Sequence, residues 1–283
     1  MIKDITLGQF FPGDSILHRI DPRMKILISV LFITMIFGAT TVGTLAVMTL
    51  LTFLLPAIGQ IPMKTMLKGI KPLRWIILIM MVIFIISGDG EGYHILWQWR
   101  FITISVEGII KAVCVSLRIV ILVASVSVLL SYTTSPIALA DAIEHLLAPL
   151  KLIRVPVHDF AMMITIAMRF IPILVEETDK IMSAQASRGA DFKSGSLIKR
   201  AKALIPVFIP LFISSVRHAD NLATAMECRC YHGGKGRTRM KRLRYQVLDY
   251  VAFFLTALLL VAVAIAAFEL NFAVCSWAGF SYA

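Results

Sequence analysis

The sequence predicts an all-α integral membrane protein with about five transmembrane helices and a cytoplasmic module of about three amphipathic helices. Of its 283 residues, 58% are apolar and only 16% are charged. A soluble domain is usually about 45–50% apolar and about 25% charged. Charge-free runs long enough to cross a bilayer alternate with basic segments. A bilayer is therefore the expected solvent for much of the chain.

The first two spans come from one charge-free run, Ile26 to Met63. As a single helix this run would be about 57 Å long at about 1.5 Å per residue, whereas a bilayer core is about 30 Å thick. The polar segment Thr40-Thr41-Val42-Gly43 therefore predicts a turn between spans near 25–40 and 43–59.

Three further spans are expected along the chain. The third, near 73–87, is shorter than the roughly 20 residues that a spanning helix needs, so we expect it to extend into its flanks. The fourth lies within 101–131, and the fifth lies within 247–268.

Basic residues at the span ends predict the orientation, because Lys and Arg are retained on the cytoplasmic side of a membrane. Cations precede the first span and follow the second: Arg19, Arg23 and Lys25, then Lys64, Lys68, Lys71 and Arg74. The connection 88–100 holds two acids and one arginine, so it is expected outside. The N-terminus is then inside and the C-terminus outside.

The sequence divides into an N-terminal part with four spans (1–131), a cytoplasmic module (132–246), and a last span with a tail (247–283). The module holds 17 of the 28 basic residues and 9 of the 17 acidic ones. Its apolar residues recur at helical spacing. Three helices are expected: 136–149, Pro156 to about Ser187, and one that follows Lys199-Arg200-Lys202, carries Ile205 to Ile213 and continues to about Cys230. They are too apolar to be solvated all round and too interrupted by charge to span, so they must lie against the membrane, one another or a partner.

An internal repeat marks the ends of the last two of these helices. The segments 179–188 and 220–229 share three residue types at identical offsets, 41 residues apart: Asp179, Ala184 and Arg188 in the first, and Asp220, Ala225 and Arg229 in the second. An arginine in a last turn interacts favourably with the helix dipole, so capping is one interpretation. The other is that each guanidinium offers a planar set of donors to a partner protein.

Two sets of residues resemble the transmembrane coupling component of energy-coupling factor transporters. The segment from Pro12 to Lys25, which includes Asp21-Pro22-Arg23, resembles the opening signature of that family. The helix ends Ser187-Arg188-Gly189 and Cys228-Arg229-Cys230 resemble its paired coupling motifs. The resemblance covers about residues 8–268. The second motif departs from the usual small-residue flanks by having cysteines, but it retains the arginine.

The resemblance implies a non-catalytic subunit of an ATP-driven importer of vitamins or other micronutrients in a prokaryotic cell membrane. Two homologous ATPase subunits would each receive one motif arginine, an exchangeable membrane subunit would capture the substrate, and this chain would bind no cofactor. The residues themselves agree on the source of energy. The only Gly-Lys pair suggestive of a phosphate-binding loop, Gly234-Lys235, is followed by Gly236 and lacks the loop's spacing.

Asp21-Pro22-Arg23 has two interpretations. It can end one element and start the next, or it can brace the N-terminal segment against the cytoplasmic helices. Arg118, within the fourth span, also has two: a functional intramembrane charge, or a side chain that hydrogen-bonds the carbonyls of neighbouring helices.

Other signals carry weaker alternatives. Cys228, Cys230 and His232 match no common zinc spacing, so small packing thiols are the favoured interpretation. The basic run 235–244 adjoins a span, which favours anionic lipid headgroups over nucleic acid as its partner. A membrane enzyme acting on lipid headgroups is the alternative function, with Glu176, Glu177 and Asp179 as its only carboxylate cluster. A passive channel is disfavoured, because the spans lack repeated polar positions.

Overall fold

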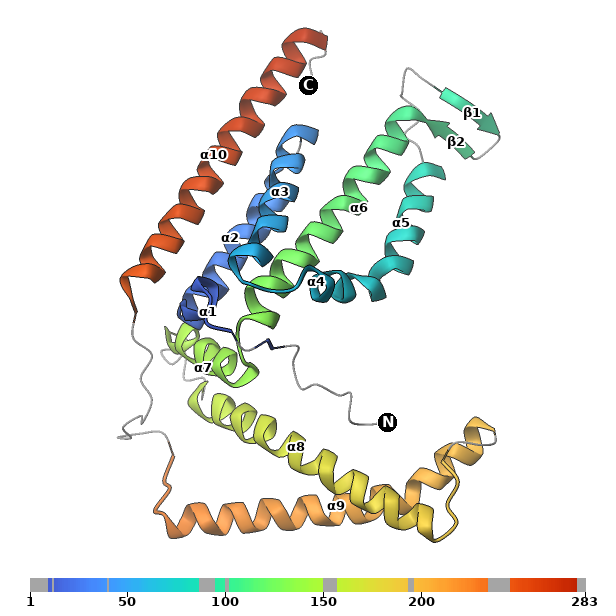
Figure 1. Cartoon of the computed structure of the whole chain (residues 1–283), viewed down its shortest axis with the longest axis vertical. Helices are drawn as coiled ribbons and strands as arrows, with labels where there is room; N and C mark the ends of the chain where they lie inside the picture. The colour runs from blue at the N-terminus through green and yellow to red at the C-terminus, as the bar shows by residue number, and fades with distance from the viewer. Residues whose placement is uncertain are drawn as a thin grey trace. The chain divides into compact units, whose positions relative to one another are not determined.

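A computed structural model of the chain describes residues 10–11, 13–39, 41–86, 95–99, 102–149, 157–192, 196–233 and 245–278. The chain divides into two compact units (Figure 1). We call Gly8–Ser135 with Leu243–Ala283 the membrane unit, and Pro136–Arg242 the crossed-helix unit.

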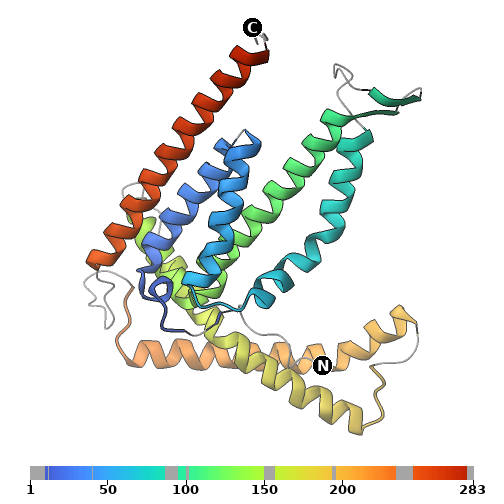
Figure 2. The same ribbon diagram turned by 45° about the horizontal axis from the view of Figure 1, so that its top comes forward.

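The membrane unit consists of helices and one small hairpin (Figure 2). Its elements are α1 (Ile16–Arg19), α2 (Pro22–Gly38), α3 (Val42–Ile58), α4 (Met63–Ile70), the 3-10 turn η1 (Lys71–Leu73), α5 (Arg74–Ile86), β1 (Ile95–Trp99), β2 (Ile102–Ser105), α6 (Val106–Val126), the π-helical turn η2 (Ser127–Tyr132) and α10 (Val247–Ala278). The all-α class is confirmed, with one addition: β1 and β2 pair antiparallel. Strand β1 lies in the predicted outer connection 88–100, whereas β2 lies at the start of the range 101–131 predicted for the fourth span.

Local sequence explains where the first helices begin. The Asp21 carboxylate accepts the N–H of Arg23 and caps α2, whose first residue is Pro22. Thr41 and Thr44 form a capping box at the start of α3. The predicted turn at 40–43 is therefore shifted, because Val42 and Gly43 already belong to α3. An N-cap threonine satisfies helix N–H groups that would otherwise lack a partner.

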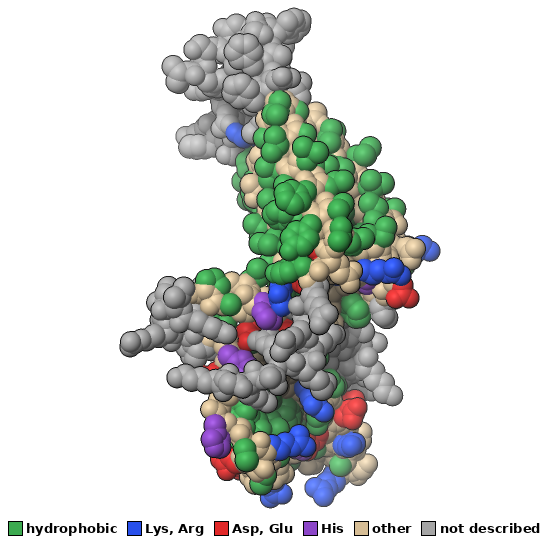
Figure 3. Space-filling model, turned by 90° about the vertical axis from the view of Figure 1, so that its left-hand side faces the viewer, with side chains coloured by type: hydrophobic (Ala, Val, Ile, Leu, Met, Phe, Trp, Pro, Cys, Tyr) green, Lys and Arg blue, Asp and Glu red, His purple; other side chains and the backbone are tan. Residues whose placement is uncertain are grey.

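The core of the membrane unit lies between α2, α3, α6 and α10. Ile36, Met48 and Ile121 are at most 1% exposed and belong to one apolar cluster. Helix α10 packs against α2, and α6 packs against α2 and α3. The outer side of α10 presents apolar side chains, and Figure 3 shows hydrophobic residues covering this face. Such a face suits contact with lipid.

Five described helices are long and apolar enough to cross a membrane: Met63–Ile86, Gly108–Tyr132, Val157–Ser187, Ile198–Cys228 and Val247–Ala267. The third predicted span extends backward into α4, as expected. The set nevertheless differs from the predicted one. Two of its members belong to the crossed-helix unit, whereas α2 and α3 have only 17 residues each. Length and composition alone do not separate spans from the module's helices.

The crossed-helix unit contains α7 (Pro136–Leu146), α8 (Val157–Ser187) and α9 (Leu197–Cys228). Helices α8 and α9 are long, cross each other and end on opposite sides of the pair (Figures 1 and 2). Helix α9 begins eight residues before Ile205, so the Lys199-Arg200-Lys202 cluster lies inside it. Pro172 lies within α8, and Pro206 and Pro210 lie within α9.

Candidate functional site

Helices α8 and α9 end with the same hydrogen-bond pattern. At the end of α8, the N–H of Ala190 donates to Gln185 O at 3.0 Å. At the end of α9, the N–H of Tyr231 donates to Met226 O, also at 3.0 Å. Each bond joins residues five apart and closes a Schellman-type cap. Both partners are shifted by 41 residues, so the sequence repeat is also a repeat of backbone geometry.

The residue after each arginine has a left-handed backbone conformation. The φ angle is 89° at Gly189 and 56° at Cys230. Glycine adopts this conformation at no steric cost, whereas any residue with a Cβ atom adopts it only at a cost in free energy. Cys230 keeps the geometry of its counterpart despite the cysteine side chain. The cysteine that follows the arginine in the second motif therefore leaves the backbone conformation of the helix end unchanged.

These caps place Arg188 and Arg229 at exposed helix ends. Ser187 and Cys228, which immediately precede them, are exposed as well. Among the described residues, no carboxylate lies within 4.0 Å of either guanidinium. Both arginines therefore keep their donors available to groups outside the described part of the chain.

The other repeated positions also match. The Ser183 hydroxyl donates to Asp179 O at 2.7 Å, and the Thr224 hydroxyl donates to Asp220 O at 2.9 Å. These bonds again differ by 41 residues. Ala184 and Ala225 are both exposed. The last two turns of α8 and α9 thus share their side-chain to backbone hydrogen bonds and an exposed alanine at the same position.

Contacts between α8 and α9 run antiparallel along the pair. Gln185 Nε2 donates to Pro206 O at 3.4 Å near one end, and the Tyr231 hydroxyl donates to Met162 Sδ at 2.9 Å near the other. The 23 residues from Pro206 to Arg229 span about 35 Å at about 1.5 Å per residue. The two arginine-bearing ends are therefore about this far apart.

A polar contact lies midway along this pair. The Ser214 hydroxyl of α9 donates to Glu177 Oε1 of α8, and His218 Nε2 lies 3.5 Å from Glu177 Oε2. This contact is not predictable from the sequence, because it depends on the antiparallel register of α8 and α9. Glu177 belongs to the carboxylate cluster of the alternative enzyme hypothesis, but its carboxylate contacts α9. Among the described residues, no group of three His, Cys, Asp or Glu side chains is arranged to hold a metal ion.

Asp21-Pro22-Arg23 is a helix start that also contacts α10. Besides capping α2, Asp21 donates its backbone N–H to Asp249 Oδ1 at 2.8 Å. The Arg23 guanidinium lies 5.4 Å from the centroid of the Tyr245 ring. The interpretation as an element boundary is confirmed. The contacts described for Asp21 and Arg23 lie within the membrane unit and reach α10 and the residues before it. Bracing against the cytoplasmic helices stays a prediction.

Lys25 and Asp249 are two buried charged residues whose importance the sequence did not reveal. Lys25 is 2% exposed, and its Nζ donates to Thr133 O at 2.9 Å and to Thr134 Oγ1 at 3.2 Å. Asp249 is fully buried and accepts the N–H groups of Asp21 and Gln246. The sequence feature that could have pointed to Asp249 is an acidic residue in the first turn of the last span. Together these residues tie the start of α2 to α10 and to the end of η2.

Arg118 hydrogen-bonds a carbonyl of a neighbouring helix, which was the second of its two interpretations. Its guanidinium donates to Ala39 O, at the end of α2, at 2.7 Å. A carbonyl at a helix C-terminus lacks an intrahelical partner, so the bond satisfies both groups. The basic run 235–244 and the Gly234-Lys235 pair lie outside the described residues.

The fold and these helix ends define a multi-pass membrane protein that carries a pair of crossed, arginine-tipped helices. A family model described as "CbiQ: Cobalt transport protein" matches residues 13–240. The chain belongs to this family.

Relatives named energy-coupling factor transporter transmembrane protein EcfT match most of the chain. The protein of Ruminiclostridium cellulolyticum is 53% identical over 249 residues, which are 88% of this chain and 92% of the relative. That of Acidaminococcus fermentans is also 53% identical, over 88% of this chain and 91% of its own length. That of Clostridium kluyveri is 48% identical over 265 residues, 94% and 97% of the two chains. The predicted resemblance is therefore confirmed.

Proposed function

We propose that this chain is the transmembrane component of an ATP-driven energy-coupling factor importer of a vitamin or other micronutrient. It transmits the movement of two ATPase subunits to an exchangeable substrate-binding membrane subunit and catalyses no reaction itself. The observation that carries the proposal is the repeated helix end, which presents Arg188 and Arg229 in the same exposed geometry.

Two equal ends suit two equal partners. Because Arg188 and Arg229 sit in matching caps, two homologous ATPase subunits can bind them by the same contacts. A separation of about 35 Å, at about 1.5 Å per residue of helix, leaves room for one protein at each end. An exposed ion pair contributes only about 0–1 kcal/mol. Each arginine must therefore be enclosed by its ATPase, where loss of one member of a buried pair costs about 2–5 kcal/mol.

The pair α8–α9 is built to carry motion between its ends. The contacts Gln185–Pro206, Glu177–Ser214 and Tyr231–Met162 join the two helices at three levels. When ATP closes the ATPase dimer, the two arginine-bearing ends are pulled together, and the helices change their crossing. We assign the polar contact at Glu177 to the pivot of this change.

An apolar stripe on α9 is suited to the substrate-binding subunit. Exposed apolar side chains recur every three or four residues along this helix: Ile205, Phe208, Ile209, Phe212, Ile213 and Val216. Such spacing places them on one face. A continuous exposed apolar face marks a protein or membrane contact, and a shift of α9 would move whatever is bound there.

Charge density supports a cytoplasmic position for α8 and α9, although both are long enough to span. Each contains six ionisable Asp, Glu, Lys or Arg residues, whereas Val247–Ala267 of α10 contains one, Asp249. A charge at the centre of a bilayer is costly. Helices with six such residues are better placed at the interface, on the same side as the basic N-terminal segment.

The test is charge reversal at both helix ends. Arg188→Glu with Arg229→Glu is expected to remove the ATPases from an affinity purification of the tagged chain and to stop substrate uptake, while the chain still inserts into the membrane. Arg169→Glu with Arg217→Glu is the matched control, because both residues are exposed on the same helices but lie outside the repeat segments 179–188 and 220–229. Normal ATPase recovery and uptake with the motif variant would refute the proposal.

A further inference from the structure

Nine residues line a hollow along one bent helix of the membrane unit. Helices α4 and α5 form one continuous helical segment, Met63–Ile86. They are joined by the 3-10 turn η1, which contains Pro72. The hollow has a volume of about 670 Å³, within the range of about 300–1,000 Å³ common for ligand sites. Its lining is Lys64, Leu67, Lys68, Ile70, Lys71, Arg74, Ile77, Leu78 and Met81. Their spacing of mostly three or four residues places them on one face.

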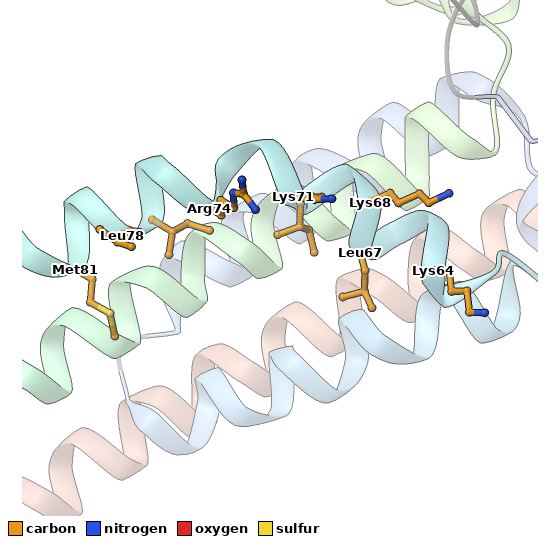
Figure 4. Close-up of a pocket in the computed structure, with 9 residues that line it drawn as sticks. Lys64, Leu67, Lys68, Lys71, Arg74, Leu78 and Met81 are labelled. Atoms are coloured by element: carbon orange, nitrogen blue, oxygen red, sulfur yellow. The ribbon is translucent and has the colours of Figure 1, made fainter. Parts of the chain in front are cut away.

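Charge is divided unevenly along this face. The four cations lie between Lys64 and Arg74, and the lining beyond Arg74 is entirely apolar. Figure 4 shows the labelled side chains following one another in this order, with Leu78 and Met81 toward the α5 end. Methylene stems of lysine can cover apolar surface while the ammonium group stays in a polar region. The surface of the hollow itself is almost entirely apolar, so the charged groups of the four cations lie at its margin, along the half between Lys64 and Arg74.

Nothing in the described chain neutralises the cationic end. The sequence contains no Asp or Glu from residue 22 to residue 88. Among the described residues, no carboxylate lies within 4.0 Å of Lys64, Lys68, Lys71 or Arg74. All four side chains are exposed. A ligand with negative charge would meet four cations on one face, none of them within 4.0 Å of a described carboxylate. The Arg74 guanidinium also lies 5.4 Å from the centroid of the Trp75 ring.

Helix α4 is held in place from its other side. Met66 is 1% exposed and packs with Val128 and Tyr132. The Tyr132 hydroxyl donates to Thr65 O at 3.3 Å, and a Cβ atom at Gly69 would lie 2.5 Å from that hydroxyl oxygen. This close approach seats α4 against η2. The cationic face is therefore fixed outward before any ligand arrives.

We propose that this hollow binds one anionic phospholipid. Lys68, Lys71 and Arg74 hold its phosphate and headgroup, and one acyl chain lies along Ile77, Leu78 and Met81. Lysine and arginine are strong phosphate donors, and the arginine fork binds two phosphate oxygens at once. Helix α5 contains no buried residue and packs against α6, so its apolar face is open to lipid. The inference is independent of the proposed function.

Native mass spectrometry of the full chain tests the inference directly. The purified chain is equilibrated in detergent with equal amounts of phosphatidylglycerol and phosphatidylcholine that carry the same acyl chains. The expected result is one retained phosphatidylglycerol. Lys68→Gln with Lys71→Gln and Arg74→Gln should lower the preference for phosphatidylglycerol by at least about tenfold, because each basic side chain adds to the attraction of anionic lipid.

Two further variants make the result specific. Lys180→Gln with Lys199→Gln and Lys202→Gln removes the same charge from the crossed-helix unit and should leave the preference unchanged. Leu78→Trp fills the apolar end and keeps all four cations, so it should reduce retention of phosphatidylglycerol. Equal retention of the two lipids by the unaltered chain would overturn the proposal. An equal loss of preference in the control variant would also overturn it. So would cross-linking of a Leu78→Cys variant in the membrane that captures a protein partner in place of lipid.

Discussion

The backbone N–H of Asp21 donates to Asp249 Oδ1 at 2.8 Å, which joins residues 228 positions apart in the sequence. The other Asp249 oxygen accepts the N–H of Gln246 at 2.7 Å. One fully buried carboxylate therefore satisfies two backbone donors, one before the first long helix and one before the last. It fixes the start of α2 against the start of α10.

Asp249→Ala should destabilise the membrane unit by about 1–3 kcal/mol, because it leaves the buried N–H of Asp21 unpaired. Asp249→Asn should cost less, since its single carbonyl oxygen still accepts one N–H. Thermal unfolding of the purified chain measures the relative stability of the variants. Val251→Ala, at an exposed position two residues further along α10, is the control with little effect. Equal stability of all three variants would contradict the role given to Asp249.

Gly69→Ala should destabilise the packing of α4 against η2. Its Cβ would lie 2.5 Å from the Tyr132 hydroxyl oxygen, and overpacking of this kind costs about 1–3 kcal/mol. Tyr132→Phe removes the oxygen and forfeits only a long hydrogen bond to Thr65 O. The double variant should therefore recover most of the loss in a thermal unfolding assay. Additive effects of the two substitutions would show that they do not meet.

Glu177 and Ser214 should be energetically coupled. Their hydrogen bond joins α8 to α9, and a bond to a charged group contributes about 1.5–3 kcal/mol. A double-mutant cycle with Glu177→Ala and Ser214→Ala is expected to give a coupling energy of at least about 1 kcal/mol in chemical unfolding. Uptake should fall in the Glu177 variant while the ATPases still copurify. A coupling energy of zero would remove Glu177 from the proposed pivot.

Gly189 and Cys230 should respond in opposite directions to substitution. Gly189→Ala introduces a Cβ atom at a φ of 89° and should cost about 1–2 kcal/mol. Cys230→Gly relieves the same constraint at the matching position of α9 and should be neutral or stabilising. Recovery of ATPases in affinity purification should drop with the first variant and hold with the second. The reverse order would contradict the equivalence of the two caps.

The sequence predicted the helices well because charges and prolines mark their ends. Helix α8 ends at Ser187 as expected, and Asp21-Pro22 starts α2. The start of α9 was missed because Lys199, Arg200 and Lys202 suggested a loop, although lysine and arginine are good helix formers. The β1–β2 hairpin was missed because its pairing depends on contacts between strands.

The candidate site was predictable where it rests on local repetition. Arg188 and Arg229 were found because the motif recurs after 41 residues. Glu177–His218 and Asp21–Asp249 were not found, since the first depends on the register of two antiparallel helices and the second joins distant parts of the chain. Local sequence does not encode either distance.

The distance between the two helix ends tests the central claim most directly. Ser183 and Thr224 occupy equivalent exposed positions of the repeat, so spin labels at Ser183→Cys and Thr224→Cys report on both ends in a transport-active background without the native cysteines. Pulsed electron paramagnetic resonance on the complex with its ATPases should show the distance between the labels shifting by several ångströms when ATP binds. An identical distance distribution with and without ATP would contradict the account.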